Sequence, residues 1–389
     1  MSVHDKRIEY GSDKAADKQK ALRESGNINA DLEEMARNVY AHLNDEISKK
    51  IFEARLHYAS TGDLGYITGL EPKYRNLNSD MQVYVEKLTK GSHCLIYGTG
   101  AAGHYLAGRF KGFGVTVDAF IDPDESKGPV DPETGIKIIS EKDLVANKEL
   151  YGDKTFIISY SKKSLALEVK NRLIEGIGID EKNIRMGIFD WRNNQGQYFD
   201  YFEAKENEVF VDCGCFDGST CYNFAGWCGH KGFDHIYSFE ADPVNYEKSK
   251  EVLAPLGKCD LYPYGTADVS KKVYFSADAF ETSSIISKEE AEKRNFEGVV
   301  EIETRALDDV LEGKKVTFIK MDIEGAEYEA LLGARKLIAE NHPRMAISVY
   351  HKFEDFITLA SLVLEMHPDY RIAFRHYGFD DLETIMYVE

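Results

Sequence analysis

Two strand-like stretches of the sequence end in side chains that can exchange protons. In VTFIKMDIEGAE, Asp322 and Glu324 directly follow the apolar run, and in RMAISVYHKFED the corresponding place is taken by His351. The carboxyl ends of parallel strands share one edge of a sheet, and open α/β sheets bind their ligands there. We therefore predict that His351 is a general base, because imidazole is neutral near pH 7 and can accept a proton. Asp322 would contact a cofactor or orient the substrate, and Glu324 is an alternative base.

Other interpretations of these side chains stay open. His376 ends a third strand-like stretch, YRIAFRHYGF, and is a further candidate base. The carboxylates of DIEGAE could instead cap their helix, since carboxylates are favoured in a first turn. Asp322, Glu324 and His351 could also hold a divalent metal, but their spacing defines such a site poorly, so the sequence predicts no metal.

A glycine turn upstream carries carboxylates of its own. VFVDCGCFDGST (209–220) has the form of a buried strand that enters a glycine turn, with Asp212 at the end of the strand. At ~4 Å a carboxylate would repel a pyrophosphate by about 1–4 kcal/mol. The same charge would attract the sulfonium and ammonium groups of S-adenosylmethionine (SAM). We predict a SAM site here; the alternative is that Asp212 only caps the following helix.

The predicted SAM contacts extend over three successive strand ends. Glu240 closes IYSFE, 22 residues after Gly218, where a carboxylate can accept hydrogen bonds from two ribose hydroxyls. Residues that follow CDLYPY are expected to line the adenine, and ETSSIIS (281–287) is expected to be a polar loop over the substrate. The predicted contacts are Asp212, Gly214, Cys215, Asp217, Gly218, Glu240, Ala241, Gly265, Thr266 and Ala267.

Another glycine turn lies about a hundred residues earlier and has no carboxylate. GTGAAG supplies Gly98, Gly100 and Gly103 between a strand-like run and a helix, which fits the G-x-G-x-x-G pattern of nucleotide-binding turns. Asp122 closes the next strand, 19 residues after Gly103, where an acid can bind ribose hydroxyls. We expect a nucleotide ligand of open identity; the alternative is a structural domain without a ligand.

Strands that alternate with helices position both turns. Residues 92–189, and the stretch from EVFVDCG to RMAISVY, alternate in this way, which indicates parallel sheets with helices on their faces. YRIAFRHY and ETIMYV form an antiparallel hairpin, which is the layout of class I SAM-dependent methyltransferases. A periodic helix from Asp31 to about Gly62 precedes both sets and is expected to dock on a neighbouring domain.

The predicted fold class is therefore α/β, with two Rossmann-like parallel-sheet domains. The second would have the class I SAM methyltransferase fold and end in an antiparallel hairpin. The predicted segments are an N-terminal helical region (1–88), a Rossmann-like nucleotide-binding domain (89–190) and a methyltransferase domain (191–389).

Composition limits the partners. The chain has 389 residues, a net charge of −19 and 43% hydrophobic residues, so it can fold but offers no basic face for nucleic acid. No apolar run approaches the ~20 residues of a membrane span, and the first residues lack a signal-peptide core. We expect a cytoplasmic protein without a membrane span. Its expected partner is a small-molecule or glycan acceptor, and a homo-oligomer through the N-terminal helix stays open.

Residues 209–389 resemble the FkbM-type SAM-dependent methyltransferases. The resemblance is carried by VFVDCGCFDGST, IYSFEADPVNYEK, TFIKMDIEGAEYEALLGARKLI, HPRMAISVYHKFED and RHYGFDDLETIMYV. It implies methylation of hydroxyl groups, often on sugars of surface polysaccharides or on secondary metabolites. The family's turn usually reads Asp-x-Gly-Ala-Asn-x-Gly, and this chain departs from it at Cys215, Phe216 and Asp217.

The earlier domain is similar to the nucleotide-binding domain of bacterial sugar acyltransferases, on LIYGTGAAGHYLAGRF, VDAFIDPD and GIKIIS. That similarity implies a UDP-sugar or a similar ligand. The prediction for the whole chain is a SAM-dependent O-methyltransferase that acts on a hydroxyl of a sugar, a glycan or a related small molecule, with an accessory nucleotide-binding domain. The alternatives are an NAD(P)-dependent oxidoreductase that uses the first turn, and a non-catalytic sensor of SAM or a nucleotide.

Overall fold

The computed structural model describes residues 28–76, 87–112, 114–160, 162–187, 196–276, 284–286, 288–293, 298–378 and 380–389. The chain divides into two compact units. The first unit holds the described residues of 61–194 together with those of 377–381. The second unit holds residues 28–60, the described residues of 195–376 and the segment 382–389. Each unit is described by itself below.

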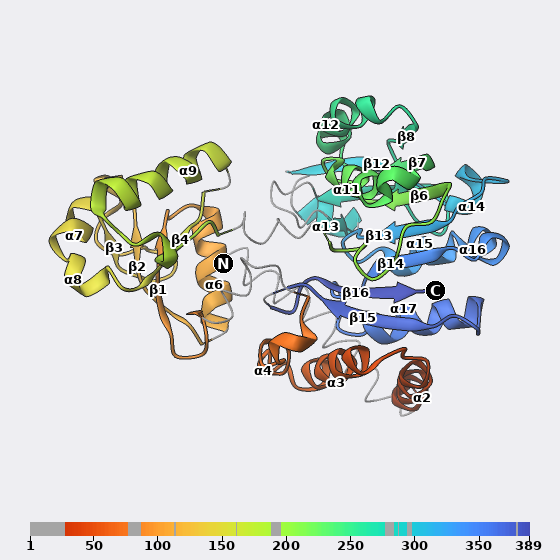
Figure 1. Cartoon of the computed structure of the whole chain (residues 1–389), viewed down its shortest axis with the longest axis horizontal. Coiled ribbons are helices and arrows are strands. Elements are labelled where there is room, and N and C mark those ends of the chain that lie inside the picture. Colours follow the sequence, from red (N-terminus) through yellow and green to blue (C-terminus); the bar gives the residue numbers. More distant parts are fainter. Residues whose placement is uncertain are drawn as a thin grey trace. The chain divides into compact units, whose positions relative to one another are not determined.

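A five-stranded parallel sheet forms the first unit (Figure 1). Its order is β3-β2-β1-β4-β5, so the direction of winding reverses between β1 and β4. Neighbouring residues of β1 face opposite sides: Ile96 belongs to the same core cluster as Phe110, whereas Leu95 belongs to a second cluster with Leu173. Both faces are thus buried, which confirms the predicted Rossmann-like sheet. Its elements are β1 (His93–Tyr97), β2 (Thr116–Ile121), β3 (Ile138–Ile139), β4 (Thr155–Ile158), β5 (Ile184–Arg185), α4 (Gly65–Thr68), α6 (Ala101–Gly112), α7 (Glu141–Ala146), α8 (Lys148–Tyr151) and α9 (Lys163–Asn171).

The second unit is built on a seven-stranded sheet of order β15-β16-β14-β13-β6-β7-β8. The five strands β14, β13, β6, β7 and β8 pair in parallel, and β16 alone is reversed, antiparallel to both β14 and β15. The predicted class I methyltransferase layout with a final antiparallel hairpin is confirmed. The strands are β6 (Glu208–Cys213), β7 (Phe233–Phe239), β8 (Cys259–Tyr262), β13 (Phe318–Met321), β14 (Arg344–Ser348), β15 (Ile372–His376) and β16 (Thr384–Val388).

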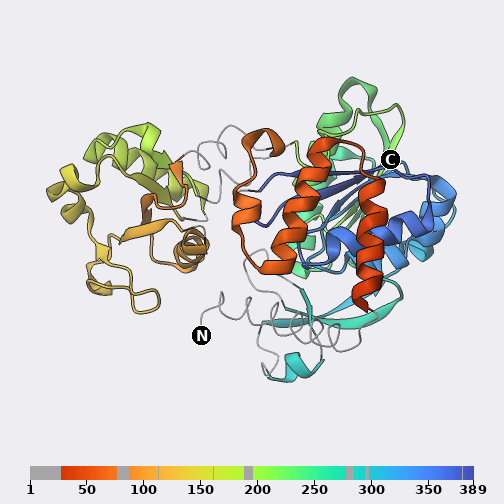
Figure 2. The ribbon, with the colours of Figure 1, turned by 90° about the horizontal axis from the view of Figure 1, so that it is seen from below.

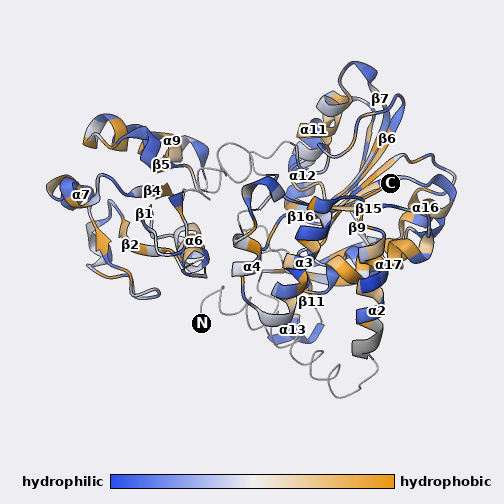
Figure 3. Ribbon diagram, turned by 60° about the horizontal axis from the view of Figure 1, so that its bottom comes forward, coloured by the Kyte–Doolittle hydropathy of each residue, from blue (hydrophilic) through white to orange (hydrophobic). Residues whose placement is uncertain are grey.

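Helices cover this sheet, and β6, β13, β14 and β16 are buried at every residue, whereas the edge strand β8 is not. Apolar residues concentrate on the strands and on α17 (Figure 3). The chain winds outward from β6 to β8 and then returns to β13 beside β6. Ligands of open α/β sheets bind at such a reversal, outside the carboxyl ends of the strands. The helices are α11 (Ser219–Cys228), α12 (Pro243–Leu253), α14 (Leu307–Val310), α15 (Glu327–Leu332), α16 (Arg335–Asn341) and α17 (Asp355–Met366).

A small four-stranded sheet in the second unit was not predicted. Its order is β11-β10-β12-β9, with β9 (Gly265–Thr266), β10 (Lys271–Ser276), β11 (Ser284–Ile286) and β12 (Val299–Arg305), and α13 (Lys288–Lys293) lies between β11 and β12 in the chain. The prediction of a polar loop over 281–287 is wrong for residues 284–286, and its remaining residues lie outside the described ranges. The alternation of VVEIETR in β12 was an available strand signal.

The N-terminal helix is broken in two and packs on the second unit. Helices α2 (Ile28–Ala41) and α3 (Glu46–Thr61) replace the single predicted helix. The carboxylate of Asp45 accepts a hydrogen bond from the N–H of Ser48 at 2.7 Å, and this N-cap starts a new helix.

Three contacts fix α3 and its N-cap residue to the terminal hairpin. The N–H of Phe374 donates to Ser48 Oγ at 3.0 Å, Arg55 donates to Thr384 at 2.6 Å, and Arg375 pairs with Asp45 at 2.6 Å. Figure 2 shows α2 and α3 lying across the sheet. The structure therefore differs from the predicted segment 1–88: its first helices belong with the methyltransferase sheet, because their apolar side chains are buried there.

Candidate active site

The glycine turn after β6 lies against the loop that follows β13. Gly214 has a φ of +80°, and a Cβ atom added to it would come within 2.3 Å of the carbonyl oxygen of Asp322. The N–H of Gly214 also donates to the carbonyl of Phe239, at the end of β7, at 3.0 Å. Only glycine combines this conformation with so close an approach. The turn therefore holds three strand ends together at the reversal of the sheet.

The other predicted residues of this turn have structural contacts. Asp217 accepts a hydrogen bond from the N–H of Ser219 at 3.0 Å and so helps to start α11. The buried thiol of Cys215 lies 3.7 Å from Ser249 Oγ. Gly218 has a φ of +82° and packs against Leu253 of α12. Contacts of these three residues with SAM remain predictions.

Asp212 is fully buried and forms an ion pair that the sequence analysis missed. Its carboxylate lies 3.2 Å from Lys320 Nζ, and Lys320 also donates to the carbonyl of Gly214 at 2.6 Å. Burial raises the pKa of Asp212, and the nearby ammonium partly offsets this. The thiol of Cys221 donates to the same carboxylate at 3.3 Å. The charge argument for SAM treated Asp212 as an unpaired anion, and this was wrong because Lys320 balances its charge.

Glu240 fits the predicted ribose contact. One carboxylate oxygen accepts the N–H of Phe216 at 2.8 Å, and the other accepts the N–H of Asp242 at 2.8 Å. Each oxygen keeps a second lone pair, as two vicinal hydroxyl donors require. Burial raises the pKa of Glu240 to about 7, while the two N–H donors partly oppose that rise.

This pKa predicts a pH dependence of cofactor binding. Two ribose hydroxyls donate to the ionised carboxylate, whose fraction with a pKa near 7 rises from about a tenth at pH 6 to about nine tenths at pH 8. The affinity for S-adenosylhomocysteine (SAH) should therefore rise about tenfold over this interval. Isothermal titration calorimetry would measure it, with Glu240→Gln losing the dependence. Glu247→Gln, on the exposed face of α12, is the matched control. An identical pH profile in wild type and Glu240→Gln would contradict the prediction.

The residues predicted to line the adenine do not end the third strand. Strand β8 ends at Tyr262, and Gly265–Thr266 form β9, which pairs with β12 in the small sheet. Gly265 nevertheless lies close to the end of β7, as predicted. A Cβ atom added to Gly265 would be 3.6 Å from the Cβ atom of Ala241, the residue after Glu240. Thr266 and Ala267 are buried, and Thr266 Oγ1 has no hydrogen-bond partner among the described residues.

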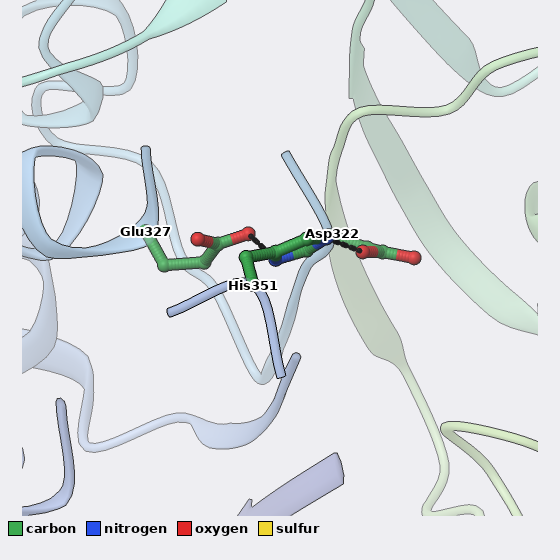
Figure 4. A group of neighbouring side chains, drawn as sticks. All are labelled: Asp322, Glu327 and His351. Carbon is green, nitrogen blue, oxygen red and sulfur yellow. Dashed lines mark ion pairs between the residues drawn. The ribbon is translucent and has the colours of Figure 1, made fainter. Parts of the chain in front are cut away.

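The predicted catalytic residues His351, Asp322 and Glu324 come together beyond β13 and β14. His351 Nε2 lies 3.4 Å from Asp322 Oδ1 and 3.8 Å from Glu324 Oε2. On the other side of the ring, Nδ1 lies 3.0 Å from Oε1 of Glu327, the first residue of α15. Figure 4 shows the imidazole between Glu327 and Asp322, with one ring nitrogen toward each. Glu327 is an addition that the sequence analysis did not select.

The prediction that His351 is neutral near pH 7 is wrong for the free protein. Burial lowers the pKa of His351, but the charges of Glu327, Asp322 and Glu324 outweigh burial and raise it to about 10. For Asp322, burial acts to raise the pKa, yet Lys320, His351 and the hydrogen bond from Tyr198 lower it overall. At neutral pH the cluster therefore holds an imidazolium between carboxylates. An imidazolium has no free lone pair with which to accept a proton.

Two tyrosines complete the cluster. Tyr198 donates its hydroxyl to Asp322 Oδ2 at 2.6 Å, and Tyr350 donates to Oδ1 at 3.1 Å. They fix the orientation of the Asp322 carboxylate. Tyr350 stands directly before His351, so its position was a usable signal. Tyr198 lies 124 residues from Asp322 in sequence, and no local pattern points to it.

His376 is not part of this group. It lies on β15, is 1% exposed, and its Nδ1 is 2.8 Å from Thr384 Oγ1 across the hairpin. Thr384 also accepts a hydrogen bond from Arg55 of α3 at 2.6 Å. These contacts indicate a structural role in the hairpin, and the cluster described above does not include His376.

The glycine turn of the first unit has the expected backbone, but the carboxylate of Asp122 is already hydrogen-bonded to other side chains. Gly98 has a φ of +106°, and a Cβ atom added to Gly103 would meet the carbonyl oxygen of Gly98 at 2.1 Å. Asp122 accepts hydrogen bonds from Thr99 Oγ1 at 2.6 Å and from Lys127 Nζ at 2.8 Å. Lys127 and Thr99 thus take the positions predicted for ribose hydroxyls. A Cβ atom added to Gly100 would meet nothing within 4 Å.

Comparisons with known proteins support the methyltransferase prediction for the second unit. Residues 212–380 match the model of the methyltransferase FkbM domain. A search of curated proteins found no match. None of the helices in the described ranges has the length and apolar character that a membrane crossing requires.

Three solved structures illustrate the similarity. The methyltransferase FkbM from Methylobacillus flagellatus KT is 19% identical with a TM-score of 0.48, and the alignment covers 87% of this chain and 99% of that one. Aeropyrum pernix fibrillarin with natively bound SAM is 12% identical with a TM-score of 0.32, over 52% and 74% of the two chains. A SAM-dependent methyltransferase from Aquifex aeolicus is 12% identical with a TM-score of 0.30, over 59% and 98%.

The family match lies on the unit with the predicted sheet order and the final hairpin. It favours the methyltransferase prediction over the oxidoreductase alternative, which depended on the first glycine turn. The chain is therefore a SAM-dependent methyltransferase whose residues 212–380 match the methyltransferase FkbM domain.

Proposed function

We propose that the chain is an O-methyltransferase that transfers the methyl group of SAM to a hydroxyl of a sugar, a glycan or a related small molecule. The observation that carries the proposal is the group of Asp322, Glu324 and His351 beyond the ends of β13 and β14. It adjoins the glycine turn after β6 through the contact of Gly214 with Asp322. Proton-transfer groups thus lie beside the predicted cofactor turn, as methylation of an alcohol requires.

SAM supplies the methyl group when it is bound. The side chains present suit it, since Glu240 keeps a free lone pair on each oxygen for the ribose and glycine forms the neighbouring turn. The hydroxyl of the acceptor loses its proton as its oxygen attacks the methyl carbon. Because His351 already holds its proton, the acceptor's proton goes to a carboxylate, Asp322 or Glu324. These two side chains are 22% and 31% exposed, so an acceptor can reach them.

The test is turnover on a defined acceptor panel. Purified protein is incubated with SAM and with sugars, nucleotide sugars, non-sugar alcohols and amines, and SAH release and product mass are followed. The expected result is a singly methylated sugar whose new methyl group is on oxygen. Methylation of nitrogen or carbon would contradict the proposal. SAH binding without turnover on any acceptor would instead favour a non-catalytic sensor.

We also propose a nucleotide or nucleotide sugar as the ligand of the first unit, in a cytoplasmic protein that works in polysaccharide biosynthesis. The open space beside Gly100 and the ammonium of Lys127, 2.7 Å from Thr99 Oγ1, support an anionic ligand at this turn. Asp122 would then hold Lys127 toward the ligand instead of reading the ribose itself.

If the ligand of the first unit is anionic, removal of the ammonium of Lys127 should weaken its binding. Lys127→Ala should weaken the binding of UDP-glucose to the full chain by about 10–100-fold, since a hydrogen bond to a charged group contributes ~1.5–3 kcal/mol. Lys182→Ala removes an exposed lysine of the same unit and serves as the control. Calorimetric titration measures both. Equal affinities of Lys127→Ala and wild type, or no binding by the folded wild type, would count against the proposal.

A further inference from the structure

Phe216, in the glycine turn after β6, has a backbone conformation that its side chain disfavours. Its φ is +54°, in the left-handed region, where the Cβ atom of an L-residue crowds the following carbonyl oxygen. Asn adopts this region more readily than bulky residues do, and Asn is the usual residue at this place in FkbM-type turns. The turn of this chain therefore carries a strained aromatic residue where a short polar one would fit.

Hydrogen bonds on both sides impose this conformation. The N–H of Phe216 donates to Glu240 Oε2 at 2.8 Å, and its carbonyl oxygen accepts the hydroxyl of Ser249 at 2.9 Å. The N–H of Gly218 donates to the carbonyl of Cys215 at 2.8 Å, which closes the turn. The backbone is thus held in the left-handed region from both ends, and the strain follows from the presence of phenylalanine in it.

Packing inside the protein offsets little of this strain. Phe216 is 43% exposed, whereas Phe239 at the end of β7 and Phe224 on α11 are 1% and 0% exposed. Of the residues on either side, Cys215 is buried and Asp217 accepts a hydrogen bond at the start of α11. Residues held in strained conformations cluster at functional sites, so a strained and exposed aromatic ring suggests contact with a ligand.

The cofactor of this unit is a suitable ligand. Glu240, the predicted ribose contact, accepts the N–H of Phe216, so the phenyl ring begins beside the place of the ribose hydroxyls. The ribose carries adenine, and purine bases stack well on aromatic side chains. Bound adenosine would also remove the exposed ring from water, which is favourable for an apolar surface.

We infer that Phe216 is a cofactor-binding residue whose ring covers the adenosine half of bound SAM. This role rests on SAM as the cofactor and on Glu240 as the ribose contact, and it does not depend on the acceptor of the proposed function. Phe216 lies outside the group of Asp322, Glu324 and His351. Its loss should therefore raise the KM for SAM and leave kcat nearly unchanged.

The test is the binding of SAH and of adenosine to full-chain variants, measured by isothermal titration calorimetry. Phe216→Ala and Phe216→Gly should each weaken the binding of both ligands by about tenfold, a typical effect of removing an aromatic–base contact. Phe216→Tyr keeps the ring and should bind like wild type. Tyr222→Ala removes a ring of similar exposure, 39%, from α11, and this matched control should also bind like wild type.

Thermal melting without ligand tests the strain separately. Glycine tolerates a positive φ and alanine does not, so Phe216→Gly should melt about 2–4 °C above Phe216→Ala. At Tyr222 the order should be reversed, because glycine is less favourable than alanine inside an α-helix. The same melting curves show whether each variant is folded. If Phe216→Gly melted no higher than Phe216→Ala, the turn would impose no strain and the inference would lose its basis.

The binding results decide the contact itself. Wild-type affinity of Phe216→Ala for SAH would overturn it, as would a loss of SAH binding with unchanged adenosine binding. Absence of SAH binding to the folded wild type would overturn it as well. Weaker SAH binding by the Phe216 variants, without methyl transfer to any hydroxyl by wild type, would refute the proposed function and leave the contact. Methyl transfer to a hydroxyl, with unchanged SAH affinity in Phe216→Ala, would refute the contact and leave the function.

Discussion

Asp322→Asn is expected to lower kcat for methyl transfer by ~10²–10⁴-fold, the usual contribution of a positioned acid–base group. The substitution keeps the size and the oxygen acceptor of the side chain but removes the charge. The loss of charge removes the proposed proton acceptor. It also removes the ion pair with His351, whose Nε2 lies 3.4 Å from Asp322 Oδ1. The KM for SAM should change far less, since the ribose contact is assigned to Glu240. Steady-state kinetics with varied SAM would separate the two constants.

Folding of the Asp322→Asn variant is checked by its thermal melting curve. The amide oxygen can still accept a hydrogen bond from Tyr198 or Tyr350, so the loop after β13 should keep its conformation. Glu312→Gln makes the same chemical change at a side chain that is 74% exposed and should retain full activity. If Asp322→Asn were as active as wild type, the group would not be the proton acceptor. Equal loss in the control would show that the assay responds to something else.

The sheet and the position of the site could be predicted because their signals are local. Alternating strands and helices predicted both parallel sheets, and the last two strands predicted the hairpin. Asp322, Glu324 and His351 could be predicted to be neighbours, because they follow the carboxyl ends of two parallel strands and such ends share one edge of a sheet. None of these inferences needed the identity of a distant contact.

The protonation of the site could not be predicted in this way. His351 was treated as an isolated imidazole, but the turn into α15 places Glu327 on its far side, and the sum of three carboxylates raises its pKa to about 10. Lys320 likewise neutralises Asp212 across two neighbouring strands. The electrostatics depend on an ion pair between residues 108 positions apart and on the geometry of a turn, so sequence spacing does not reveal them.

Lys320→Met should be the most destabilising single substitution proposed for this chain. Lys320 and Asp212 are buried with 3% and 0% side-chain exposure, and their charged atoms are 3.2 Å apart. Removal of one partner from a buried ion pair leaves an uncompensated charge and costs about 3–5 kcal/mol of unfolding free energy. Since 1 kcal/mol shifts the Tm of a domain this size by about 2–4 °C, the melting temperature should fall by on the order of 10 °C.

A second substitution separates charge from packing. In Lys320→Met/Asp212→Asn both charges are absent, so the double variant should recover most of the lost stability, because a neutral buried pair is often no worse than an ionic one. Lys272→Met, at a side chain that is 73% exposed, is the matched control and should melt like wild type. Denaturant unfolding of wild type, Lys320→Met, Asp212→Asn and the double variant gives the coupling energy directly. A double variant less stable than Lys320→Met would show that shape, and not charge, decides the effect.

The pH dependence of Lys320→Met has a definite sign. Burial raises the pKa of Asp212 in the folded protein, and loss of the ammonium that opposes this raises it further. A carboxyl group whose folded pKa exceeds its unfolded value destabilises the fold as pH rises through that interval, because the unfolded chain then binds fewer protons. The stability deficit of Lys320→Met should therefore be smaller at pH 5 than at pH 8, where Asp212 must either remain charged or hold a proton at a cost. A deficit that is the same at both pH values would mean that the Lys320–Asp212 charge pair does not stabilise this sheet.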